Sequence, residues 1–453
     1  MACTPAMNAG RLIRGAAAAA VIALLVAPLQ GSDSGFFDDP SVATFTIEAP
    51  LQTLFDRGVK DESFEVPGRI AVAGATDAID AAVTVRGNTS RTECPFPKLK
   101  LKIKGDTGFF AGLHGVKINT HCGEAPGDEL TKRFGRLANE KSPWREAVAY
   151  RIAEAAGART PRTRLARITY VDTTSPSSAA KRLTRNALLI EDDDDLRKRF
   201  GATGEITPAE FTNAQDLFTP IDVARVAFTQ ALIGNFDWCL MMAPGDRYRC
   251  DARRKLWNMS ALRTPSGAIP IVEDFDLTGP VTGPHIWFDH AFPRGFAASD
   301  IDTEVIAQVQ RTRTLFNRPT LDRMRQDFIA RRERIISAID RGAVDPRGSE
   351  LAHAYVDAFY RAMPDADFYR PVVAQPGVRI FTTANGSTEA CGAGDTIPPG
   401  TPLKELRREN GRAEVQLLDA LWKWAPPTEC VPVHQSPVWI DPSSISADFP
   451  RDR

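Results

Sequence analysis

The chain contains little of what a structural zinc site requires. It has seven cysteines and six histidines among 453 residues. No Cys-x-x-Cys motif occurs, and no histidine pair accompanies the cysteines at a zinc-ligand spacing. Structural zinc sites are normally built from such closely spaced pairs. The scarcity of these pairs argues against zinc as the explanation for the cysteines.

An excess of positive charge is also missing. The 56 Lys and Arg residues are balanced by 57 Asp and Glu, which gives a formal net charge of -1 at pH 7. A nucleic-acid binder gains affinity from counterion release and needs a basic face for it. The composition therefore argues against nucleic acid as a partner. With 43% hydrophobic residues, the chain is long enough for two or more domains.

Long apolar runs are missing beyond the N-terminus. Residues 15–27 form one apolar run, which Arg11 and Arg14 precede. The run is too short to cross a bilayer comfortably, but its length and basic flank are typical of a signal peptide. We predict that residues 1–31 are an export signal, that no membrane span remains after cleavage, and that the protein is periplasmic or extracellular. An uncleaved anchor is the alternative.

Six cysteines remain when Cys3 is removed with the signal. An even number of cysteines in an exported chain indicates disulfides. The six fall into three well-separated pairs, and loop-closure entropy favours partners that are near in sequence. The predicted disulfides are Cys94–Cys122, Cys239–Cys250 and Cys391–Cys430.

Two stretches place acidic residues next to apolar segments. An amphipathic helix is predicted from about Ile221, and Gly234 ends it as a left-handed C-cap residue, so that Asp237 lies in the following loop. Residues 269–272 form a short apolar strand that leads directly into Glu273, Asp274 and Asp276. Carboxylates at such helix and strand ends offer hard oxygen ligands to Mg²⁺. Turn and cap residues are the alternative interpretation.

Residues 97–104 alternate strictly between apolar residues and lysines. This alternation predicts a β-strand with one apolar and one basic face. An edge strand that its lysines protect from aggregation is one explanation. A lysine that reaches across a cleft to a phosphate is the other.

The clearest helix signal covers residues 142–157. Ser142 is the expected N-cap, Pro143 stands at the first helical position, and Gly157 follows the last turn. Glu146 lies beside a buried stripe that we expect from Trp144, Val148, Ile152 and Ala155. Strands are expected at residues 43–49, 81–86, 115–119, 164–170 and 186–191, and a short helix after Asp192.

These segments follow the order seen in proteins similar to spore coat protein H, the CotH kinase-like family. The resemblance covers residues 45–345 and rests on eight loose motifs, at 85–91, 97–104, 142–151, 158–163, 188–191, 199–201, 234–238 and 274–276. It implies an α+β, two-lobed, divergent protein-kinase fold. It also implies ATP and Mg as cofactors and a protein hydroxyl as the acceptor.

The resemblance implies roles for residues on both sides of the expected cleft. Lys102 or Lys100 would contact the ATP phosphates and Glu146 would pair with that lysine, while Glu191 is included among the cofactor-binding residues. Asp237 would act near the acceptor hydroxyl. The metal ligands would be Asp274, Asp276 and Asn258.

The chain departs from the family pattern after Asp237. Related sequences have His-Asn a few residues later, whereas here residues 239–250 form an insertion. Asn258 is the proposed counterpart of that Asn, and the His has none. A non-catalytic pseudokinase or envelope-binding protein is therefore the alternative to an active phosphotransferase.

The C-terminal part differs in composition. Residues 320–341 have helical spacing with a charged outer face, and residues 349–363 form a further helix, so that residues 346–376 are expected to be a helix and linker. Residues 377–447 contain short strands with Pro and Gly, and they resemble a bacterial SH3-like domain. The resemblance implies a small all-β barrel with a cell-envelope ligand.

Overall fold

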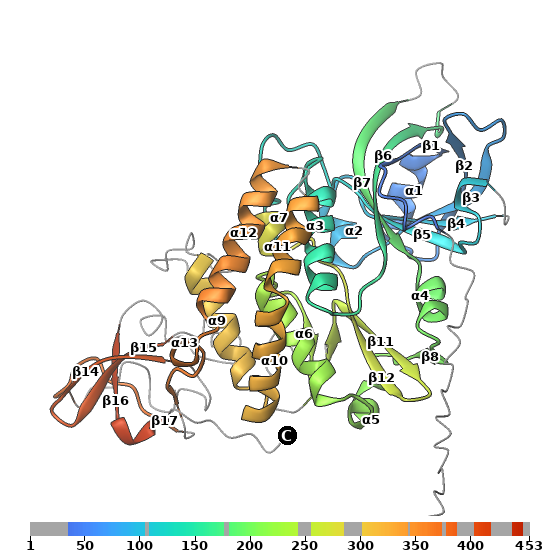
Figure 1. Ribbon diagram of the computed structural model, residues 1–453. Coiled ribbons are helices and arrows are strands. Elements are labelled where there is room, and N and C mark those ends of the chain that lie inside the picture. Colours follow the sequence, from blue (N-terminus) through green and yellow to red (C-terminus); the bar gives the residue numbers. More distant parts are fainter. Residues whose placement is uncertain are drawn as a thin grey trace, which may run out of the picture. The chain divides into compact units, whose positions relative to one another are not determined.

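The computed structural model describes residues 35–104, 108–175, 181–242, 255–284, 301–342, 345–373, 377–386, 403–417 and 437–446. The structural statements below concern these residues, and Figure 1 shows their helices and strands. The expected signal segment, residues 1–31, lies outside them. No helix in the described ranges is long and apolar enough to cross a membrane.

Seven strands close into a barrel in the order β1-β2-β3-β4-β5-β7-β6. Their bounds are Ala43–Ala49, Glu65–Val72, Ile79–Val85, Leu99–Ile103, Gly115–Asn119, Thr163–Asp172 and Arg182–Glu191 for β1 to β7. Neighbouring strands are antiparallel, except that β1 and β6 are parallel. Alternate apolar side chains, such as Ile47, Leu101 and Ile118, fill the barrel core. The strands predicted for this region are confirmed. Strand β2 was not predicted, because Pro67 and Gly68 conceal its pattern.

The lysine strand β4 does not lie at an edge. It pairs with β3 on one side and with β5 on the other. The predicted alternation is correct, because Leu99 and Leu101 are fully buried in the barrel. The edge-strand explanation is wrong, since β4 has a neighbour on both sides in the closed barrel and its lysines have no free edge to protect.

The main helices pack around a second core. They are α3 (Ser142–Ala155), α6 (Pro220–Leu232), α9 (Ile301–Arg313), α10 (Arg318–Ala330), α11 (Arg332–Gly342) and α12 (Pro346–Arg361). Shorter helices are α1 (Leu51–Gly58), α2 (Thr89–Glu93), α4 (Asp193–Arg199), α5 (Phe211–Ala214), α7 (Gly279–Thr282) and α13 (Asp365–Phe368). The α+β class is thus confirmed, while the division into two lobes stays an expectation.

Small strands accompany these helices. β8 (Gly204–Glu205), β11 (Met259–Thr264) and β12 (Gly267–Val272) form one sheet, and β9 (Cys239–Leu240) pairs with β10 (Leu256–Trp257). Strand β12 confirms the apolar strand predicted before the acids. Gly234 lies after α6 with φ of 56°, as predicted, and an added Cβ there would lie 2.2 Å from the Tyr355 ring.

Several helix predictions need correction. Ser142 is the first residue of α3 and not its cap, and α3 is buried on almost its whole circumference, because helices and the barrel surround it. Residues 320–341 form two helices, since α10 ends before Arg331. Helix α12 belongs to the main core, where Tyr355 is fully buried, and is not part of a linker.

The described C-terminal residues form a small β structure. Strands β14 (Leu403–Glu409), β15 (Arg412–Leu417) and β16 (Val438–Ile440) make a three-stranded sheet, and β13 (Val372–Val373) pairs with β17 (Ile445–Ser446). Val415 and Ile440 lie in a separate apolar core. The expected strand near Val378 makes only an isolated bridge, from Phe381 to Trp439. An SH3-like barrel remains an expectation.

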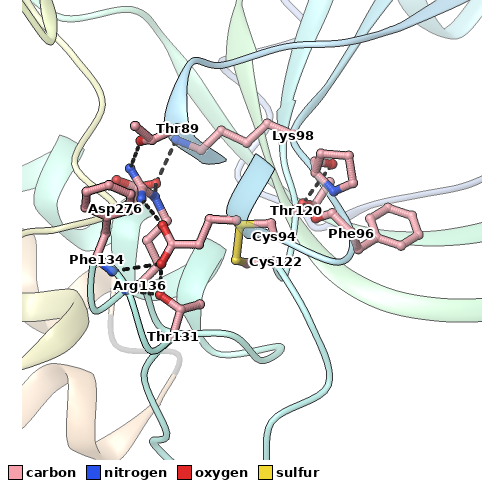
Figure 2. Close-up of a disulfide and its surroundings, with 12 residues drawn as sticks. Thr89, Cys94, Phe96, Lys98, Thr120, Cys122, Thr131, Phe134, Arg136 and Asp276 are labelled. Carbon is pink, nitrogen blue, oxygen red and sulfur yellow. Dashed lines mark hydrogen bonds and ion pairs between the residues drawn. A yellow bond between two sulfur atoms is a disulfide. The ribbon is translucent and has the colours of Figure 1, made fainter. Parts of the chain in front are cut away.

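One predicted disulfide is confirmed. Cys94, just after α2, is bonded to Cys122, three residues beyond β5, and Figure 2 shows the bond close to Arg136 and Asp276. Cys250, Cys391 and Cys430 lie outside the described residues, so the other two disulfides stay predictions.

Loss of the Cys94–Cys122 disulfide should destabilise the fold. The bond links residues 28 apart in sequence, and a cross-link of this span stabilises a protein by about 3 kcal/mol, mainly by restricting the unfolded chain. The double variant Cys94→Ser, Cys122→Ser should therefore unfold at lower urea concentration than the oxidised protein. A change in unfolding free energy below about 1 kcal/mol would contradict this expectation.

Candidate functional site

The loop that follows β12 is held in place by helix α3. The backbone N–H of Asp274 donates to the Tyr150 hydroxyl at 3.1 Å, and that of Phe275 donates to Glu146 Oε1 at 3.3 Å. The Phe275 ring packs on Tyr150 with centroids 4.6 Å apart. Asp274 itself has φ of 60°, an uncommon value for a residue other than glycine. Three contacts with α3 thus fix an acid loop of unusual backbone conformation.

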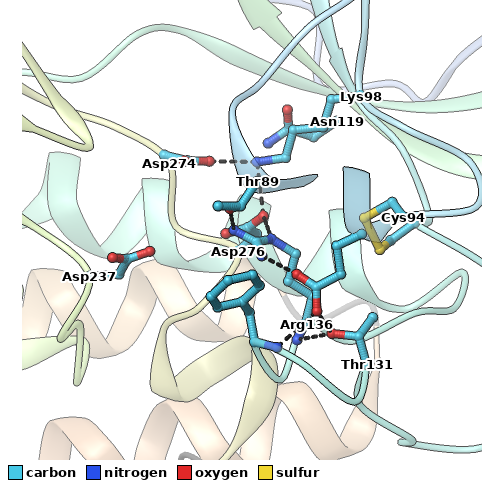
Figure 3. Close-up of polar contacts among 12 residues, drawn as sticks. Thr89, Cys94, Lys98, Asn119, Thr131, Arg136, Asp237, Asp274 and Asp276 are labelled. Atoms are coloured by element: carbon cyan, nitrogen blue, oxygen red, sulfur yellow. Dashed lines mark hydrogen bonds and ion pairs between the residues drawn. A yellow bond between two sulfur atoms is a disulfide. The ribbon is translucent and has the colours of Figure 1, made fainter. Parts of the chain in front are cut away.

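Lys98 binds two of the loop's acids. Its Nζ lies 2.5 Å from Asp274 Oδ1 and 2.9 Å from Asp276 Oδ2 (Figure 3). The side chain of Lys98 is only 7% exposed. Burial alone would lower the pKa of Lys98, but the two carboxylates outweigh burial and raise the pKa above its ordinary value. Lys98 is therefore charged, and it joins the strand region before β4 to the acid loop.

Arg136 is a second buried cation at the loop. Its Nε donates to Asp276 Oδ2 at 3.1 Å, and its Nη1 lies 2.6 Å from Glu93. Burial would raise the pKa of Asp276, but Lys98 and Arg136 hold that pKa well below its ordinary value. The other oxygen, Asp276 Oδ1, is buried without a hydrogen-bond partner. The sequence did not predict Arg136, because it stands in a loop with no periodic pattern.

Glu146 lies inside the protein next to this cluster. Its two carboxylate oxygens each accept a hydrogen bond of 2.7 Å from Asn119 Nδ2. Burial raises the pKa of Glu146 to about 7, with Asp276 and Asp274 adding to the increase and Lys98 opposing it. Lys98 is thus close enough to influence Glu146, whereas the sequence predicts Lys102 or Lys100 as the partner of Glu146.

The structure distinguishes the lysines that share one face of the strand. Side-chain exposure rises from 7% at Lys98 to 28% at Lys100 and 56% at Lys102. Lys100 pairs with Asp192 at 2.5 Å, and Lys102 pairs with Glu65 at 2.7 Å. Position along the strand, which alternation does not encode, therefore decides which lysine reaches the acid loop. Lys102 does not approach the acid loop, and its phosphate contact stays a prediction.

A cavity of about 420 Å³ opens beside Asp274. Its polar and charged lining is Arg86, Asn88, Lys100, Lys117, Tyr150, Asp193, Glu205, Trp257, Asn258, Ser260, Glu273 and Asp274, and its apolar lining is Ile190, Leu256 and Met259. Lys117, on β5, contacts Asp193 and lies 3.7 Å from Glu273. Lys117 was not predicted, because β5 has no lysine pattern. The cavity thus combines apolar walls with cations and acids.

Asn258 and Asp237 lie next to each other. The Asn258 amide donates to the backbone carbonyl of Asp237 at 2.6 Å, and Trp257 Nε1 donates to Asp237 Oδ1 at 3.1 Å. Asn258 and Trp257 line the cavity, whereas Asp237 is buried behind them. Figure 3 places Asp237 apart from Lys98 and Arg136. The structure therefore brings Asn258 to Asp274 around one cavity, with Asp237 connected through its neighbours.

Two predicted site residues have other contacts. The Glu191 carboxylate accepts hydrogen bonds from Arg199 Nε at 2.8 Å and Nη2 at 2.6 Å, and it does not line the cavity. Its cofactor contact stays a prediction, because the structure shows only that Arg199 binds the carboxylate. Asp276 is also absent from the lining, because Lys98 and Arg136 hold it below.

The donor set fits a magnesium ion only in a limited way. No group of three or more His, Cys, Asp or Glu side chains suited to a metal occurs among the described residues. Mg²⁺ in nucleotide sites, however, is held by one or two carboxylates together with substrate phosphates. Asp274, whose side chain is 32% exposed, and Asn258 both line the cavity, and each side chain carries an oxygen atom. These two residues fit a magnesium ion that takes its remaining ligands from substrate phosphates.

Comparisons with known proteins add little to this geometry. No protein-family model matches the chain, and no curated protein matches it significantly. Among solved structures the chain is similar to the Helicobacter pylori proinflammatory kinase CtkA, with 14% identity and a TM-score of 0.32, over 59% of this chain and 90% of that one. At this TM-score the likeness carries no argument about the fold or the function of this chain.

The raised pKa of Glu146 predicts a pH dependence of stability. An acid with a raised folded-state pKa binds its proton more tightly in the folded than in the unfolded protein. The stability that Glu146 contributes is therefore full below its ordinary pKa of 4.5 and is lost as the pH rises through about 7. Between pH 4.5 and 7.5, wild type should lose on the order of 3 kcal/mol relative to Glu146→Gln. Urea unfolding at several pH values measures the free energies. If the unfolding free energies of wild type and Glu146→Gln change equally with pH over this range, the raised pKa of Glu146 is wrong.

Proposed function

We propose that this chain is an exported kinase-like phosphotransferase that transfers phosphate from Mg-ATP to a protein hydroxyl. The observation that supports the proposal best is the convergence of Lys98, Glu146 and Asp274 beside one cavity. These residues come from the start of a barrel strand, from α3 and from the loop after β12. Their types suit phosphoryl transfer, which mainly requires positioned substrates and neutralised charge.

Three lysines lie on the phosphate side of the proposed site. Lys100 and Lys117 line the cavity, so they are the lysines placed to contact phosphate oxygens there. Lys98 lies deeper and orients Asp274 and Asp276 through its two ion pairs. A lysine ammonium is a flexible point charge that commonly binds phosphate in nucleotide sites. We therefore assign phosphate binding to Lys100 and Lys117, and positioning of the acid loop to Lys98.

Asp274 and Asn258 are the residues that would hold Mg²⁺, and the ion would supply charge neutralisation at the phosphates. Asp274 has one oxygen on Lys98, so its other oxygen is the one available toward the cavity. Asp237 would orient the acceptor hydroxyl and accept its proton. The apolar residues Ile190, Leu256 and Met259 would pack against the base.

Export and targeting complete the proposal. The basic and apolar N-terminal run supports a signal peptide, and the confirmed Cys94–Cys122 disulfide is in keeping with an oxidising compartment. The three-stranded sheet β14–β15–β16, with its own apolar core, supports a separate C-terminal module. We assign this module the SH3-like role of binding a cell-envelope ligand.

A non-catalytic pseudokinase is the second candidate. One observation favours it: Lys98 and Arg136 already compensate the charges of Asp274 and Asp276. A fold that uses these acids as internal ion pairs does not require a metal to balance them. In that case the acids would hold the barrel and the acid loop together.

Thermal shift with nucleotide tests the two candidates. A ligand at 100 times its dissociation constant stabilises the folded state by about 2.7 kcal/mol. ATP with Mg²⁺ should therefore raise the melting temperature of the full chain, and ATP in EDTA should raise it much less. Equal melting temperatures with Mg-ATP, with EDTA and without nucleotide would reject the phosphotransferase and leave the non-catalytic candidate.

A further inference from the structure

A second cavity, of about 460 Å³, lies on another side of α3. Its polar and charged lining is Asp38, Tyr150, Arg151, Glu154, Arg159, Thr160, Arg162, Thr163 and Arg199. Four of these residues are arginines, against two carboxylates, Asp38 and Glu154. Both carboxylates are exposed, so water screens their charge. The lining therefore has more cationic than acidic side chains, and the proposed phosphotransfer does not use them.

Arg151 is the arginine with the fewest partners. It makes no ion pair or hydrogen bond among the described residues, and its Nη1 atom is buried without any hydrogen-bond partner. Burial lowers the pKa of Arg151, and the charge of Arg341 adds to the decrease. An arginine remains charged even so. Arg151 as a whole is half-buried, but a buried donor without a partner is costly, so an anion that accepts a hydrogen bond from Nη1 would relieve this penalty.

Two other arginines of the cavity have acidic partners but retain free donors. Arg159 uses Nη1 for Asp222 at 2.7 Å. Arg199 binds Glu191 and the backbone carbonyl of Thr160. A guanidinium has five N–H donors, so each arginine can give further hydrogen bonds to a ligand.

We propose that this cavity is a second ligand site, which binds a phosphate group through Arg151, with Arg159 and Arg199 as additional donors. A tetrahedral phosphate has several acceptor oxygens and can bind more than one guanidinium at once, whereas a carboxylate has two oxygens. The volume exceeds that of one phosphate, so the group is either free phosphate or part of a small organic phosphate. The site goes beyond the proposed transfer reaction, because it lies outside the cavity that contains Asp274.

The two cavities share one residue, Tyr150, whose hydroxyl accepts from the Asp274 backbone. The test must therefore separate the new site from the nucleotide cavity. Phosphate binding to the full chain is measured by calorimetry without Mg²⁺ or nucleotide, at constant ionic strength, with inorganic phosphate and with glycerol 3-phosphate. Tighter binding of glycerol 3-phosphate identifies an organic phosphate, and equal or weaker binding identifies free phosphate.

Arg151→Gln should raise the dissociation constant for inorganic phosphate at least about tenfold. Arg69→Gln is the matched control, since Arg69 is an exposed arginine on β2 that does not line the cavity, and it should leave the constant unchanged. An unchanged constant in Arg151→Gln, or an equal loss in Arg69→Gln, would overturn the proposal.

Stability provides the second measurement. Without phosphate, Arg151→Gln should melt no lower than wild type, because Arg151 has no ion pair among the described residues and water screens its interaction with the exposed Glu154. A clearly lower melting temperature would show that the fold needs this cation and would count against a ligand site. Arg151→Lys keeps the charge but lacks the planar fork, so it should fold and bind phosphate with an intermediate constant. If Arg151→Lys binds phosphate as tightly as wild type, the guanidinium group is not what recognises the phosphate.

Discussion

Replacement of Asp274 by asparagine should weaken Mg-ATP binding at least about tenfold, a change of about 1.4 kcal/mol. The substitution keeps the shape of the side chain but removes the negative charge that would balance Mg²⁺. Lys98 retains Asp276 as its partner at 2.9 Å, so the loss of unfolding free energy should stay at about 1–2 kcal/mol. Calorimetry with and without Mg²⁺, together with urea unfolding, measures the two effects separately.

Asp237→Asn is the matched control for that experiment. Asp237 does not line the cavity, and its backbone carbonyl accepts from Asn258, so the variant should keep Mg-ATP affinity within about twofold while it lowers phosphate transfer. If the wild-type protein phosphorylates itself, the rate of this autophosphorylation measures phosphate transfer. Unchanged Mg-ATP affinity in both variants, together with lowered melting temperatures, would mean that these acids serve the fold alone.

Replacement of Lys98 by methionine should produce the largest loss of stability. Lys98 balances the charges of Asp274 and Asp276 inside the protein. Glu146 lies close enough to raise the pKa of Lys98 further. Removing one partner of a buried ion pair leaves an uncompensated charge and costs about 3–5 kcal/mol. Lys98→Met should therefore unfold at a much lower urea concentration than wild type.

Lys102→Met is the control for this prediction. Lys102 lies on β4, four residues after Lys98, but it is 56% exposed and pairs with the exposed Glu65. Exposed ion pairs contribute little to stability. Lys102→Met should thus unfold like wild type, and a similar loss in both variants would show that strand propensity, and not the buried ion pairs, causes the effect at Lys98.

Part of the candidate site was predictable because its signals are local. The apolar strand before Glu273 and the glycine after α6 depend on short-range patterns, and both are present at the predicted positions. The helix that carries Glu146 was predicted for the same reason, although its first residue is not a cap. The carboxylate loop and its supporting helix could therefore be found from neighbouring residues alone.

The cations of the site were not predictable in this way. Lys98, Lys100 and Lys102 have the same alternation, and only the position of β4 within the barrel separates their environments. Arg136 is 140 residues from Asp276 in the sequence, in a segment without periodicity. An ion pair of this kind leaves no local signal, because neither residue alone indicates its partner.

The sequence by itself determined the α+β class, most barrel strands, the confirmed disulfide and the positions of the acids. Each depends on alternation, on turn residues or on the spacing of cysteines, which act over short stretches of chain. Only the tertiary structure decided that β4 is closed on both sides, that α12 belongs to the main core, and that Lys98 and Arg136 hold the acid loop. These features depend on burial and charge pairing between distant segments, whose free energy arises only when the segments meet.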